Sequence, residues 1–140
     1  MEANRFDEIY WPLRITYGAI PLLAGLDKFL NILVDWKIYL PEAAGDLLPF
    51  SPETFMMIVG VIEMIAGLAV LTVLTRLGAY VVMIWLVLIA IVVIIAGHLD
   101  IAARDLGLAA GAFALGQIAG MRGEPWLPGS SQSRGASHAG

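Results

Sequence analysis

The chain has 140 residues, enough for one domain, and its net charge is −4. Hydrophobic residues make up 59% and charged residues 14%, with a mean hydropathy of +0.82. A soluble domain carries about 25% charged residues, so much of this surface must face something other than water. The acidic balance argues against a nucleic-acid partner, which would need a basic patch. The chain has no cysteine, which excludes disulfides, thiol redox chemistry, iron–sulfur clusters and thiolate metal sites.

Four apolar stretches follow one another along the chain, at about Pro12–Val34, Thr54–Leu74, Leu77–Ala96 and Ile101–Gly120. A helix of about 20 residues spans the roughly 30 Å hydrocarbon core of a bilayer. Since a backbone in lipid must satisfy its own hydrogen bonds, we predict an all-α integral membrane four-helix bundle. Residues 1–126 form this transmembrane domain. The Pro-, Gly- and Ser-rich residues 127–140 are predicted to be a disordered tail.

The connections predict the topology of the bundle. The second and third stretches meet at Thr75–Arg76 and the third and fourth at Gly97–Asp100, so consecutive helices must be antiparallel neighbours in an up-down bundle. Buried helices of a soluble protein are the alternative, but four of them would leave no polar shell. The lysines and arginines favour both termini in the cytoplasm. One side holds Arg5, Arg14, Arg76, Arg122 and Arg134, and the other holds Lys28, Lys37 and Arg104.

Glycines mark the expected helix contacts. In the fourth helix Gly107 and Gly111 lie on one face and Gly116 and Gly120 on the opposite one, which predicts close packing on both sides. In the second helix the face of Gly60, Gly67 and Glu63 is predicted to be buried. In the first helix Pro21 removes a backbone donor, which predicts a kink.

Glu63 and Lys28 are the ionisable residues that most need an explanation, because a charge at membrane depth costs roughly 2.5–3.5 kcal/mol. Glu63 lies well inside the second stretch. It is either a carboxylate that accepts protons or binds a ligand, or a structural Glu that locks two helices together. Lys28 either extends to the headgroups or lies in the bundle interior, where it would pair with Glu63 or bind a carbonyl or anionic group.

The topology brings further polar residues to the same end of the bundle. Arg104 shares a face with Gly107 and Gly111, so we expect it to point towards a packed neighbour. His98 closes the third helix, where an interfacial role is the simpler interpretation. The predicted polar pocket near one membrane face comprises Asp27, Lys28, His98, Arg104 and Asp105, with Glu63 below them. One histidine with scattered carboxylates is a poor metal signature, so no metal site is predicted.

The sequence resembles the DoxX-like family of small four-helix membrane proteins over about residues 13–120. Its matching segments are Leu13-Arg14 with Ala24-Gly25-Leu26-Asp27-Lys28-Phe29, Val59-Gly60-Val61-Ile62-Glu63 with Ala66-Gly67-Leu68, and Leu74-Thr75-Arg76-Leu77-Gly78-Ala79. In addition, Asp105 to Gly116 resembles the last helix of that family. The resemblance implies a bacterial or archaeal cytoplasmic-membrane protein. Some relatives are linked to quinone-coupled oxidation of sulfur compounds, and others to membrane oxidoreductase complexes that handle oxidative stress.

Three functions follow as hypotheses. The first is a membrane subunit associated with an oxidoreductase or a quinone-linked process. Its pocket would bind a quinone, Lys28 or Arg104 would donate to a carbonyl, and Glu63 or His98 would relay protons. Any electron donor would come from a soluble or membrane oxidoreductase partner, since the chain itself is expected to hold no cofactor. The second is a non-catalytic scaffold or assembly subunit whose buried charges fasten helices, with glycine faces that would dock a partner or a second copy. The third is a small carrier or channel.

Overall fold

The computed structural model describes residues 2–33, 35–39, 41 and 47–127. Within them lie four α-helices: α1 (Glu2–Leu30), α3 (Pro52–Leu71), α4 (Thr75–Ile95) and α5 (Leu99–Met121). A short 3-10 helix, η1 (Trp36–Tyr39), follows α1. The predicted all-α fold with four helices is confirmed. The predicted disordered tail, apart from Leu127, lies outside the described residues.

Local chemistry favours the start of α3. Ser51 caps α3 by accepting a hydrogen bond from the Thr54 backbone N–H at 3.2 Å, and Pro52 occupies the first turn, where its missing N–H costs nothing. The first helix begins at Glu2 and not near Pro12. It continues through both Pro12 and Pro21 without a break in the helix.

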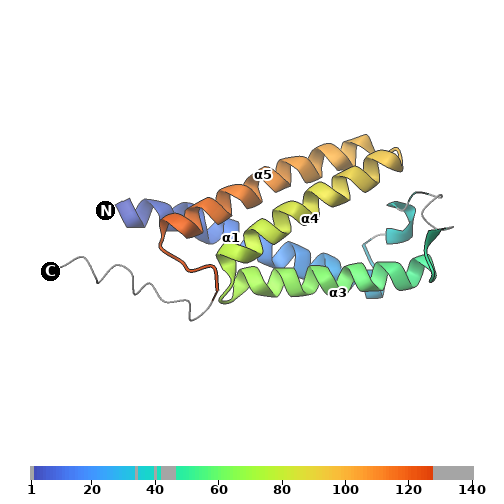
Figure 1. The fold of residues 1–140 in the computed structure, drawn as a ribbon, viewed down its shortest axis with the longest axis horizontal. Helices are drawn as coiled ribbons and strands as arrows, with labels where there is room; N and C mark the ends of the chain where they lie inside the picture. The colour runs from blue at the N-terminus through green and yellow to red at the C-terminus, as the bar shows by residue number, and fades with distance from the viewer. Residues whose placement is uncertain (1, 34, 40, 42–46, 128–140) are drawn as a thin grey trace.

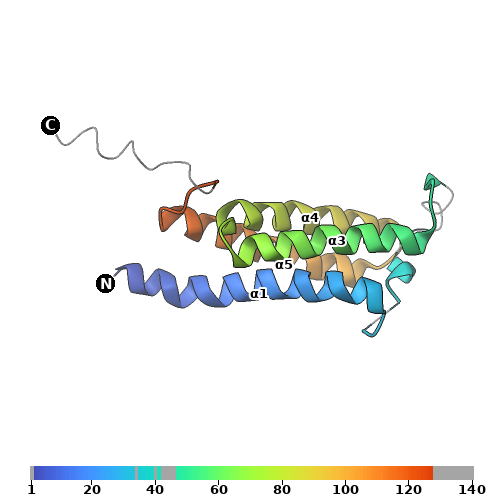
Figure 2. The ribbon, with the colours of Figure 1, turned by 90° about the horizontal axis from the view of Figure 1, so that it is seen from below.

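Figures 1 and 2 show an up-down arrangement of two helix pairs, α1 with α3 and α4 with α5. The most extensive contacts are those within the pairs. In Figure 1 the α4–α5 pair is inclined to the α1–α3 pair. The start of α1 and the end of α5 lie at one end, which we call the terminal end. The opposite end, where α1 ends and α3 begins, is called the loop end.

Glycines bring α1 and α3 together as predicted for the face of Gly60 and Gly67. A Cβ built on Gly60 would lie 2.6 Å from the carbonyl oxygen of Gly25, and one on Gly67 would lie 2.5 Å from that of Gly18. Atoms cannot approach that closely without moving. The two backbones therefore touch only because these positions have no side chain.

The fourth helix, α5, is approached closely by side chains on two faces. Gly111 lies against the Tyr17 side chain, Gly116 against Tyr80, and Gly120 against Arg76. A Cβ on Gly107 would meet nothing within 4 Å. The predicted close packing on both faces is therefore found at Gly111, Gly116 and Gly120, and is wrong only at Gly107, where the neighbouring helix does not reach.

The apolar core is continuous at the terminal end and thin at the loop end. One cluster of buried residues draws on all four helices and includes Tyr17, Val70, Val82 and Leu115. A second cluster contains only Ala90, Val93 and Ala102, which belong to α4 and α5. By length and composition, α3 and α4 are the described helices that are apolar enough to cross a membrane.

Candidate functional site

Lys28 and Glu63 form a buried ion pair between α1 and α3. Lys28 Nζ lies 2.5 Å from Glu63 Oε2, and the two side chains are only 5% and 8% exposed. The second carboxylate oxygen, Oε1, accepts a hydrogen bond from Trp85 Nε1 on α4 at 3.3 Å. Gly60, one turn before Glu63, leaves room for the Lys28 side chain. Both carboxylate oxygens of Glu63 therefore have donors from other helices.

Asp27 holds in place the segment that follows α1, which carries Trp36 over Lys28. Its carboxylate accepts the backbone N–H groups of Ile32 and Leu33, at 3.0 Å and 3.2 Å, just beyond the end of α1. It also accepts Trp36 Nε1 at 2.9 Å. The Trp36 ring consequently lies over Lys28, with Nζ 3.8 Å from the ring centroid. Asp27 is thus a structural residue that positions Trp36.

Asp105 is buried on α5, with 2% of its surface exposed. Its Oδ1 accepts hydrogen bonds from the neighbouring Arg104, at 3.2 Å from Nε and 3.1 Å from Nη2. Its Oδ2 is buried and has no hydrogen-bond partner among the described residues. Lys28 lies close enough to Asp105 for an electrostatic interaction. Asp105 therefore belongs to the same interior region as the Lys28–Glu63 pair.

Arg104 and His98 lie outside that interior. The Arg104 side chain is 60% exposed, so the prediction that it points towards a packed neighbour is wrong. It projects from a part of α5 that the other helices leave uncovered, as they do at Gly107. His98 Nε2 lies 3.3 Å from the carbonyl oxygen of Ile38 in η1. This contact ties the α4–α5 link to η1.

A pocket of about 360 Å³ lies at the loop end. The buried side of the pocket is formed by Lys28. The other sides are formed by the end of α1, the loop and the first turns of α3. The lining residues are Lys28, Asn31, Asp35, Glu53, Met56 and Met57. Of the six predicted site residues, only Lys28 lines this pocket.

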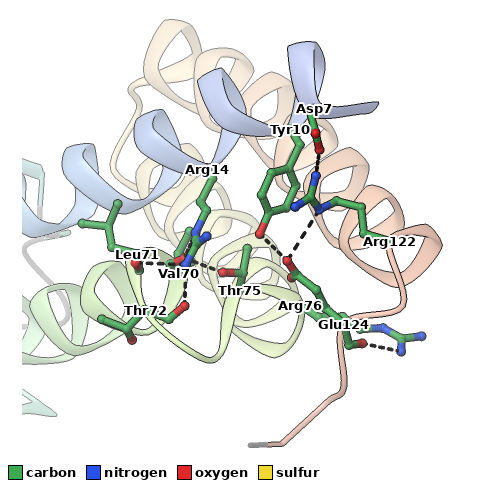
Figure 3. Close-up of polar contacts among 10 residues, drawn as sticks. All are labelled: Asp7, Tyr10, Arg14, Val70, Leu71, Thr72, Thr75, Arg76, Arg122 and Glu124. Carbon is green, nitrogen blue, oxygen red and sulfur yellow. Dashed lines mark hydrogen bonds and ion pairs between the residues drawn. The ribbon is translucent and has the colours of Figure 1, made fainter. Parts of the chain in front are cut away.

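The terminal end carries a second polar cluster, shown in Figure 3. Arg14 on α1 reaches the last turn of α3, donating from Nε to the Val70 carbonyl at 3.1 Å. Its Nη2 donates to Leu71 O at 3.1 Å and to Thr72 O at 2.5 Å. These carbonyls have no partner within the helix, so a cation here both bonds them and favours the helix dipole.

The segment after α5 lies across the same end. Glu124 Oε1 accepts the Tyr10 hydroxyl at 2.5 Å, and its backbone oxygen accepts Arg76 Nη1 at 3.2 Å. Arg122 pairs with Asp7 and lies over the Tyr10 ring. Burial raises the pKa of the Tyr10 hydroxyl, and the hydrogen bond to Glu124 raises this pKa further. The network joins α1, α4 and the end of α5.

Sequence reasoning missed the aromatic partners of the buried charges. Trp36 and Trp85 were not expected to bond Asp27 and Glu63, although an indole N–H in an apolar stretch usually finds an acceptor when buried. The cluster around Arg14 and Glu124 was missed as well. Tyrosine, arginine and glutamate near helix ends are common, so only tertiary contacts distinguish them.

The comparisons with known proteins add no relatives. No protein-family model, curated protein or solved structure matches this chain.

Proposed function

We propose that the protein is an integral membrane protein whose four α-helices cross the bilayer. Only 39% and 28% of the most apolar 18-residue stretches of α3 and α4 lie buried inside the bundle. The core helix of a soluble protein is, by contrast, mostly buried. Large apolar side chains are also exposed on all four helices. Examples are Leu23 on α1, Ile65 on α3, Ile84 and Ile91 on α4, and Phe113 on α5. Exposed apolar surface of this extent marks a lipid-facing molecule.

The proposed orientation places the terminal end in the cytoplasm. Arg14, Arg76 and Arg122 lie at that end, which agrees with the positive-inside rule. The chain has no cysteine, so single cysteines report sidedness cleanly. In intact cells a membrane-impermeant thiol reagent should label Ser51→Cys at the loop end and not Thr72→Cys at the terminal end. The reverse pattern would invert the orientation, and labelling of neither or both would contradict four crossings.

We further propose that the protein acts as a non-catalytic membrane subunit whose buried charges fasten its helices. The observation that carries this is the closed Lys28–Glu63 pair. Lys28 Nζ is held at 2.5 Å and both Glu63 oxygens are occupied, the second by Trp85. Because both Glu63 oxygens are bonded by donors of the protein itself, from α1 and α4, the pair fixes the positions of α1, α3 and α4 relative to one another. Any redox chemistry would then belong to a partner.

Glu63→Gln tests this role, with Glu53→Gln as its control. Glu63 is buried, whereas Glu53 is exposed in the first turn of the same helix. We expect Glu63→Gln to lower the thermal stability of the purified protein, because it leaves Lys28 buried without its counter-ion. Glu53→Gln should change stability little. A Glu63→Gln protein that folds and assembles like the wild type would rule out the fastening role.

A quinone-linked role, in line with the DoxX-like resemblance, is the second candidate. The pocket of about 360 Å³ supports it, because the buried Lys28 forms one wall. An ammonium there is a suitable donor for a quinone carbonyl. Extraction of the purified protein with organic solvent, followed by titration with a short-chain quinone, tests this candidate. A protein that carries no quinone and binds none when quinone is added would exclude it.

A further inference from the structure

The loop-end pocket connects the surface with the charged interior. Asn31, Asp35, Glu53 and Met57 are exposed, whereas Lys28 on the opposite wall is 6% exposed. The pocket therefore leads from the outside to the Lys28 side chain. Two carboxylates, those of Asp35 and Glu53, lie along this route.

Beyond Lys28 lie two buried carboxylates. Glu63 is 6% exposed and has a donor on each oxygen. Asp105 is 2% exposed and differs, because Arg104 donates only to Oδ1 while Oδ2 has no donor within the described part of the chain. A buried, unbonded carboxylate oxygen is unfavourable, and binding a proton removes its charge.

The charge balance also favours a proton at Asp105. One buried cation, Lys28, lies among three buried carboxylates, those of Asp27, Glu63 and Asp105, and is committed to Glu63 at 2.5 Å. Arg104 is the other charged group on Asp105, and its side chain is 60% exposed. The positive charge of Arg104 is therefore spread into its surroundings and does not fully compensate Asp105 in the interior.

The interior is closed on its other side. The cluster of Tyr17, Ala66, Val70, Val82 and Leu115 fills the bundle between these charges and the terminal end. A packed apolar core therefore separates Lys28 from the terminal end.

We propose that Asp105 is a proton-binding site that exchanges protons with the loop-end face through the pocket bounded by Lys28. In this reaction the Asp105 carboxylate takes up one proton on Oδ2 and becomes a neutral carboxyl group, while Oδ1 keeps its hydrogen bonds from Arg104. The groups around the site are Lys28 and the buried Asp27 from α1 and Arg104 from α5, with Glu63 and Trp85 beyond Lys28. Among the described residues, Asp105 shares no hydrogen bond with the fastening pair, so either proposal can fail without the other.

Infrared difference spectroscopy of the purified protein in lipid nanodiscs tests the site directly. A protonated carboxyl group has a carbonyl stretching band that a carboxylate lacks. We expect the wild type to lose such a band as the pH rises, and Asp105→Asn to lack that band at every pH. Asp100→Asn, an exposed position in the first turn of the same helix, is the matched control and should keep it.

A second pair of variants tests the route. Met57→Trp would fill the pocket, whereas the adjacent Ile58→Trp changes an exposed residue that does not line it. On transfer to heavy water, the shift of the Asp105 band should be slower in Met57→Trp and unchanged in Ile58→Trp. The proposal is overturned if the wild type shows no pH-dependent band. It is equally overturned if a correctly folded Asp105→Asn keeps the band, or if both tryptophan variants exchange at the wild-type rate. If Asp105→Asn does not fold, Asp105→Glu replaces it and must shift the band.

Discussion

At the terminal end, arginines bind main-chain carbonyls and surface carboxylates, whereas in the interior nearer the loop end a lysine and a glutamate meet away from solvent. Arg14 donates to carbonyls at the end of α3 from a partly exposed position. Lys28 and Glu63 are almost fully covered. An exposed contact can be replaced by water when it is lost, but a buried charge that loses its partner cannot be rehydrated. The two regions should therefore respond very differently to the removal of one charged group.

Removal of Lys28 should have the largest effect. Lys28→Met leaves Glu63 buried without its cation, so we expect a loss of about 3–5 kcal/mol in the free energy of unfolding. The double variant Lys28→Met/Glu63→Leu should recover most of this loss, because no charge then remains. Reversible unfolding of the purified protein in mixed micelles measures both. A single variant as stable as the wild type would remove the distinction between the two regions.

The glycine contact between α1 and α3 should have the next largest effect. In Gly60→Ala the new Cβ would lie 2.6 Å from the carbonyl oxygen of Gly25, so the helices must move apart, at a cost of about 1–3 kcal/mol. Gly107→Ala is the matched control, since nothing lies within 4 Å of its Cβ. This control should be neutral or slightly stabilising, because alanine favours a helix. Equal unfolding free energies for the two variants would contradict the packing described.

Arg14→Met should be milder than either change. It removes three hydrogen bonds to the end of α3, yet Val70 O keeps the Thr75 hydroxyl at 2.7 Å and water can reach the exposed Thr72 carbonyl. We expect a loss of about 1–2 kcal/mol. Hydrogen exchange should show faster opening of the last turn of α3 and unchanged protection around Glu63. Loss of protection around Glu63 would mean that the two regions unfold as one unit.

Tyr10→Phe should have the smallest effect, about 1 kcal/mol from the lost hydrogen bond to Glu124. This stabilising effect is lost at alkaline pH. The pKa of Tyr10 is raised above its ordinary value of 10.0, so its contribution is full below that value and is lost as the pH rises through the folded-state pKa. Alkaline unfolding should therefore be shallower in Tyr10→Phe than in the wild type. Identical pH profiles would show that the hydroxyl contributes nothing.

The sequence was a good guide to some parts of the site and a poor guide to others. The spacing of Gly60, Glu63 and Gly67 predicted a buried face, because these positions lie on one side of a helix and such periodicity is local. The same reasoning gave a wrong prediction for Arg104, whose side chain is exposed. Arg104 shares a helix face with Gly107 and Gly111, but periodicity does not say how far along that face a neighbouring helix extends. That depends on the inclination between the two helix pairs.

By itself the sequence determined the four helices, their order and the glycines at the α1–α3 contact, because apolar run length and helical period are properties of consecutive residues. The expectation that α1 would begin near Pro12 was wrong, since a proline is tolerated when enough of the surrounding helix is stable. Only the tertiary structure decided the choice that the sequence left open for Lys28, between an extended surface lysine and an interior ion pair. It did so because Gly60 lets α1 approach α3 closely enough for Lys28 to reach Glu63, while Asp27 holds Trp36 over the pair.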